Sequence, residues 1–79
     1  MNVGKCFHHY HKGKLLRRGV VVAQTATNYR VWLVDPFSGL LTKTCYIPIT
    51  RTADWKWFNT REESNEAYEK HFAELESTP

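Results

Sequence analysis

The side chains best suited to chemistry in this sequence are histidines and cysteines, most of them near its start. Zinc takes four such ligands in a tetrahedron, and a chain usually supplies them as closely spaced pairs. A β-strand here would direct Cys6 and His8 to one face and His9 and His11 to the other, and the sequence has no Cys-x-x-Cys pair. We therefore predict no metal site and no cofactor. The complete set of candidate ligands is Cys6, His8, His9, His11, Cys45 and His71.

The same residues are the candidates for nucleophilic or acid–base catalysis. Such sites need a base held beside its target in a concave pocket, whereas a very small barrel is filled by its own side chains. An isolated cysteine such as Cys6 or Cys45 is more often a small buried apolar residue. We predict that the protein is not an enzyme. The remaining alternative is a small enzyme whose site is shared across an oligomer.

Basic residues dominate the first part of the chain. Residues 1–34 carry six Lys and Arg and no acid, whereas residues 35–79 carry five basic and eight acidic residues. This asymmetry indicates a basic face that attracts a polyanion or an acidic protein surface, unless the two halves neutralise each other. Arginines can neutralise phosphates while aromatic rings stack on unpaired bases. The candidate nucleic-acid-binding residues are Lys12, Lys14, Arg17, Arg18, Arg30 and Trp32, and we expect the arginines to form one patch.

Aromatic residues also support a second hypothesis, the binding of another protein. Aromatic side chains and arginine are enriched at interface hot spots, and Phe37 lies in a proline-containing turn where it is hard to bury without a cover. The candidate partner-binding residues are Phe37, Trp32, Tyr10 and Trp55. The alternative is that Trp32 and Trp55 are covered by a helix. Salt separates the two hypotheses, because phosphate contacts release counterions and a hydrophobic interface does not.

Turn signals divide residues 5–58 into short segments, which is typical of an all-β unit. We expect strands at about 6–10, 15–24, 29–34 and 40–49, and a short one at 55–58. Gly19, inside the long second strand, predicts a bulge or bend. Strict alternation places Tyr29, Val31 and Leu33 in the core.

The hydrophobic period changes after residue 58. Thr60, followed three residues later by Glu63, has the form of a capping box at a helix N-terminus. The helix is predicted to run from 61 to about 75. Its apolar stripe consists of Ala67, Tyr68, His71, Phe72 and Leu75. The predicted fold is mainly β: a small SH3-like barrel or a strongly bent antiparallel sheet of about five strands, with a C-terminal helix.

The chain is short enough for one domain, residues 1–79. A core of this size is thin, so a homodimer is one way to add stability. Two cysteines cannot build the disulfide framework of a small secreted domain, which favours a reducing cytoplasm. The start of the chain lacks the apolar stretch of a signal peptide, and the apolar run Val20–Ala23 is too short to span a bilayer. We expect a soluble cytoplasmic protein with no membrane contact.

Two resemblances accompany these observations. The segments 19–22, 29–33 and 46–49 resemble strands of SH3-like small barrels of the Tudor-like kind. The chain from about 4 to 70 is also similar to a group of small, functionally uncharacterised proteobacterial proteins associated with phages and mobile elements. The second resemblance implies an adaptor or inhibitor that binds a host or phage protein, and it implies no activity. The residues that carry it are Phe7, His8, Asp35–Phe37, Ile47–Ile49, Trp55–Phe58, Thr60, Glu63 and Ala67–Glu69.

Overall fold

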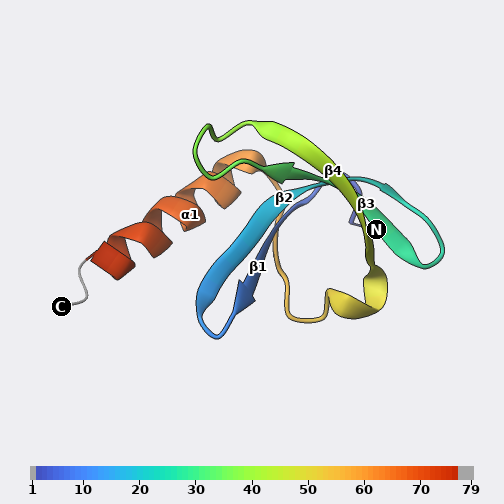
Figure 1. The fold of residues 1–79 in the computed structure, drawn as a ribbon, viewed down its shortest axis with the longest axis horizontal. Helices are drawn as coiled ribbons and strands as arrows, with labels where there is room; N and C mark the ends of the chain where they lie inside the picture. The colour runs from blue at the N-terminus through green and yellow to red at the C-terminus, as the bar shows by residue number, and fades with distance from the viewer. Residues whose placement is uncertain (1, 77–79) are drawn as a thin grey trace.

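The computed structural model describes residues 2–76, which form five antiparallel β-strands followed by one α-helix (Figure 1). The strands pair in the order β4-β3-β2-β1-β5, so β4 and β5 are the two edges of one open sheet. The prediction of a mainly β fold with a C-terminal helix is confirmed. The elements are β1 (Cys6–His11), β2 (Lys14–Gln24), β3 (Asn28–Val34), β4 (Leu41–Pro48), the 3-10 helix η1 (Ile49–Arg51), β5 (Lys56–Phe58) and α1 (Arg61–Glu76).

The sheet bends strongly enough for strands that are not neighbours to share a core. Phe7 of β1 stacks on Trp55 with ring centroids 3.9 Å apart. Tyr29 of β3 meets Trp57 of β5 edge-on at 5.7 Å, although two strands separate β3 from β5 in the sheet. These ring contacts require the sheet to curl. The buried apolar core consists of Phe7, Val21, Tyr29, Val31, Ile47 and Trp55, with Leu33, Cys45, Ile49 and Trp57 packed against it.

The long strand β2 is the element that allows this bend. It pairs with β1 along its first part and with β3 along its second part, and its register is interrupted at Leu16 and again at Val22. One extra residue in a strand bends it and increases its twist. The sequence predicted one irregularity at Gly19, whereas the strand has two, one on each side of Gly19. Gly19 itself stays in register with Phe7 and Leu33.

The helix covers only part of the sheet face opposite the core. The first turns of α1 pack against β1 and β5, and the helix then diverges from the β1–β2 hairpin (Figure 1). The molecule is therefore elongated, with principal extents of 44 × 24 × 20 Å. Among residues 2–76 no helix has both the length and the apolar character needed to cross a membrane.

The predicted capping residues close the N-terminus of α1. The backbone amide of Glu63 donates to Oγ1 of Thr60 at 3.1 Å, and the Glu63 carboxylate accepts from the amide of Asn59 at 3.2 Å. The carboxylate thus reaches one residue further back than the capping-box pattern requires, since the pattern directs it to the amide of Thr60 itself.

We expect Thr60→Ala to lower the free energy of unfolding by about 0.5–2 kcal/mol, because the amide of Glu63 loses its acceptor. Thr60→Ser keeps the hydroxyl and should lose less. Urea denaturation of the two variants measures the difference. Equal midpoints for the alanine and serine variants would show that the side-chain cap contributes nothing to the helix.

Candidate functional site

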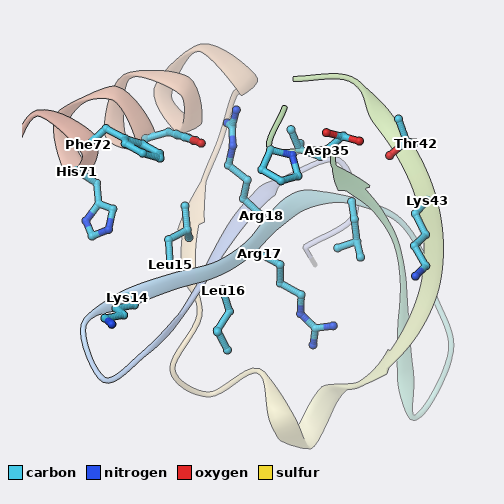
Figure 2. A pocket seen from close by; sticks show the side chains of 14 residues that line it. Lys14, Leu15, Leu16, Arg17, Arg18, Asp35, Thr42, Lys43, His71 and Phe72 are labelled. Atoms are coloured by element: carbon cyan, nitrogen blue, oxygen red, sulfur yellow. The ribbon is translucent and has the colours of Figure 1, made fainter. Parts of the chain in front are cut away.

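A groove of about 620 Å³ lies between α1, β2 and the ends of β3 and β4 (Figure 2). The groove exists because α1 diverges from the β1–β2 hairpin and the β3–β4 turn lies next to the space left between them. Apolar residues make up much of its lining. They come from four parts of the chain and are Leu15, Leu16, Leu33, Val34, Pro36, Tyr68 and Phe72.

The bulge in β2 decides which side chains face the helix. Leu16 has no partner on β1, since Leu15 pairs with Tyr10 and Arg17 pairs with His9. Leu15 and Arg18, three residues apart, consequently both point toward α1, whereas Leu16 and Arg17 both point away from it (Figure 2). An apolar and a cationic side chain are thereby placed side by side in the groove.

Arg18 is held against the helix by two contacts. Its guanidinium carbon lies 4.1 Å from the centre of the Tyr68 ring, and its Nη1 donates to Oδ1 of Asn65 at 2.8 Å. Burial lowers the pKa of Arg18, and the nearby Arg61 adds to this. Arg18 lines the groove and also an adjoining cavity of about 420 Å³ beside the β3–β4 turn. Among the residues that line both the groove and this cavity, Arg18 is the one that lies in a β-strand.

A buried histidine joins α1 to β1 behind the groove. His8 is 0% exposed, with Nε2 2.8 Å from the Ser64 hydroxyl and Nδ1 3.1 Å from the Tyr10 hydroxyl. Burial lowers the pKa of His8 to about 4, and the positive charge of Arg18 and the nearby His71 contribute. Ser64 is 4% exposed, so a substrate cannot reach its oxygen. The hydrogen bond between His8 and Ser64 therefore anchors α1 to β1.

The metal-competent residues are distributed as their alternation predicted. His8 lies under α1, whereas His9 faces the core side, with its ring 6.0 Å from that of Trp55. Cys6 and Cys45 are free thiols on opposite faces of the sheet, as their strand partners show. Within residues 2–76 no group of three or more His, Cys, Asp or Glu side chains is placed to hold a metal ion.

Two of the four predicted partner-binding aromatic residues, Trp55 and Tyr10, pack against other side chains of the protein. Trp55, predicted to bind a partner, is 5% exposed and stacked on Phe7, so its ring belongs to the buried core. Alternation already places Trp55 and Trp57 on one face, and the bent sheet encloses that face. Tyr10 is half-buried, bonded to His8 and edge-on to His71 at 5.3 Å.

The other two predicted aromatics remain accessible. Phe37 is 99% exposed at the β3–β4 turn. Trp32 is half-buried on the face of the sheet opposite the core. It is next to Arg30 on that face, because residues two apart in a strand point the same way.

The predicted basic residues do not form one patch. Arg17 and Arg18 point to opposite sides of β2 (Figure 2), and the expectation that they join Arg30 in a single surface is wrong. Adjacent residues on a regular strand alternate, and a bulge at Leu16 shifts that pattern without bringing the two together. Lys12 is exposed at the β1–β2 turn with φ of 52°, and Lys14 begins β2 on the groove.

Sequence reasoning missed Ser64 and the groove residues Leu15 and Val34. Ser64 lies four residues before Tyr68 on the same helical stripe, and that spacing could have shown that it faces the sheet. Leu15 and Val34 read as ordinary strand residues, because the groove depends on how far α1 diverges. Phe72 was assigned to the apolar stripe, and it is 46% exposed. The side chain of Leu75, also assigned to that stripe, lies outside the described part of the chain.

No protein-family model, curated protein or solved structure matches this chain. The assignment of a function therefore depends on the geometry of the groove and its charges.

Proposed function

We propose that this protein is a non-enzymatic protein-binding module whose groove takes an apolar segment of a partner protein. The observation that carries the proposal is the groove itself, in which Phe72 is 46% exposed beside Leu15 and Val34. Burying one large apolar side chain there contributes about 1.5–3 kcal/mol. Basic residues at the groove, including Lys14 and Lys43, favour a protein segment over a lone apolar ligand.

Phe37 supports the same proposal from the neighbouring turn. Its side chain is 99% exposed, yet its backbone is fixed, because the Asp35 carboxylate accepts from the amides of Phe37 and Ser38 at 2.7 and 3.1 Å. An aromatic side chain on a rigid turn loses little entropy on binding. Phe37 and Pro36 also line the adjoining cavity, so one partner segment can contact both hollows.

The role we propose for such a module is that of an adaptor or inhibitor of a host or phage protein in the cytoplasm. Two resemblances support this part: that to SH3-like barrels, which serve as binding modules, and that to small proteins of phages and mobile elements. The partner is a separate protein. The competing occupant of the groove is a second copy of the chain. Analytical ultracentrifugation of the free protein tests this, because sedimentation separates a dimer from a monomer by mass.

A selection of random 12-residue peptides displayed against the full chain tests the proposal. We expect peptides rich in Leu or Phe, and we expect Phe72→Gln to weaken them about tenfold or more because an apolar contact is lost. Tyr46→Gln is the matched control. Tyr46 is a 64% exposed aromatic on β4, opposite Arg30 and remote from the β3–β4 turn.

Selected peptides that are equally weakened by both substitutions, or by neither, would contradict binding in the groove. So would a stable dimer of the free chain that is disrupted by Phe72→Gln, because a second copy would then fill the groove.

Binding of single-stranded nucleic acid is the second candidate function. It is favoured by Arg30, Trp32 and Tyr46, which share the sheet face opposite the core. The arginine could contact phosphate and the rings could stack on bases. In this case Tyr46→Gln would weaken binding, Phe72→Gln would not, and affinity would fall steeply with added salt.

A further inference from the structure

We infer that Arg18 recognises a carboxylate, so that the partner segment presents an Asp or Glu next to its apolar anchor. The inference rests on the proposed function, because it specifies the chemistry of the ligand in the same groove. Its starting observation is a half-buried guanidinium at the junction of two hollows, packed beside Leu15.

Arg18 is held in place without a counter-charge. Within residues 2–76 its guanidinium contacts the Tyr68 ring and the amide oxygen of Asn65, and neither is an anion. A guanidinium carries five N–H donors, and the bond to Asn65 uses Nη1. A planar fork fixed on an aromatic ring is suited to a bidentate carboxylate.

The charges that line the groove favour an anion from outside the chain. In the adjoining cavity Arg61 is offset by the acidic Glu69, whereas the groove itself carries Lys14 and Lys43. Asp35 is the acidic residue lining the groove, and its Oδ1 already accepts two backbone amides of the turn. Burial of a cation without a partner is unfavourable, so an incoming carboxylate gains more from Arg18 than from an exposed lysine.

The position of Arg18 determines what accompanies the carboxylate. Leu15 and Arg18 point the same way from β2, toward α1 (Figure 2). A ligand whose carboxylate meets Arg18 therefore places its neighbouring residues against Leu15 and Phe72. The ligand class is a peptide that combines a carboxylate with an adjacent Leu or Phe.

A double-mutant cycle with a selected 12-residue peptide tests the inference. For the wild-type chain, changing the peptide's Glu to Gln should weaken binding about tenfold, as expected for a charged hydrogen-bonded pair. For Arg18→Gln the same change should have less than about a twofold effect. Arg30→Gln is the matched control, since Arg30 is an exposed arginine on β3, and it should keep the tenfold effect.

The composition of the selected peptides gives a second readout that needs no variant of the protein. Enrichment of Asp or Glu next to Leu or Phe supports the inference, even if Arg18→Gln folds poorly. Peptides that depend on Phe72 but lack acids, or that tolerate Glu→Gln without loss, would overturn the inference and leave the proposed function standing. Selected peptides that do not depend on Phe72 would overturn both.

Discussion

Gly19→Ala will lower the free energy of unfolding by about 3 kcal/mol or more, which for so small a core amounts to unfolding. A Cβ on Gly19 would overlap the backbone carbonyl of Trp32. That carbonyl belongs to β3, which pairs with β2 on this side, so it cannot rotate away as a flexible side chain could. Relief of the overlap would require β2 and β3 to separate.

Gly39→Ala is the control for this prediction. Gly39 has a φ of 72° and nothing within 4 Å of an added Cβ, so its substitution costs only the conformational strain of about 1–2 kcal/mol. Urea denaturation followed by circular dichroism compares the two variants. If Gly19→Ala proves as stable as Gly39→Ala, then β2 and β3 do not approach each other as the structure describes.

Lowering the pH from 6.5 to 4 will weaken the fold through His8. Its pKa is lowered to about 4 in the folded protein, first by burial and then by Arg18 and His71, while the usual value is 6.5. The unfolded chain therefore binds a proton between these values and the folded chain does not. The contribution of neutral His8 is complete above pH 6.5 and is lost as the pH falls toward 4. Its size is on the order of 2–3 kcal/mol.

The pH dependence can be assigned to His8 by comparing slopes. His8→Gln removes the titrating group, so the fall in unfolding free energy between pH 6.5 and 4 should become shallower by the same amount. His11→Gln, an exposed position on β1, should retain the full slope. A wild-type slope that His8→Gln leaves unchanged would show that His8 is accessible to protons in the folded state.

Local patterns predicted much of the fold because local physics determines those elements. The alternation in β3 places Tyr29 and Val31 in the core, and the Thr60 hydroxyl does accept the amide of Glu63. Each of these features depends on residues within a few positions of one another. The sequence also predicted a short strand at 55–58, and β5 is found at Lys56–Phe58.

The candidate site depended on tertiary structure that local patterns do not contain. Trp55 and Phe37 are both aromatic residues near turns, yet one is 5% and the other 99% exposed. The difference arises because the bent sheet encloses Trp55, while the β3–β4 turn projects Phe37 into solvent. The groove depends on the bulge at Leu16 and on the angle at which α1 leaves the sheet. Neither has a distinct sequence signal.

The most direct test of the central claim is an NMR titration of the ¹⁵N-labelled full chain with a selected peptide. We predict that chemical-shift changes concentrate at Leu15, Arg18 and Val34 and at the amide of Phe72, which line the groove. Changes confined instead to Arg30, Trp32 and Tyr46, on the sheet face opposite the core, would contradict binding in the groove.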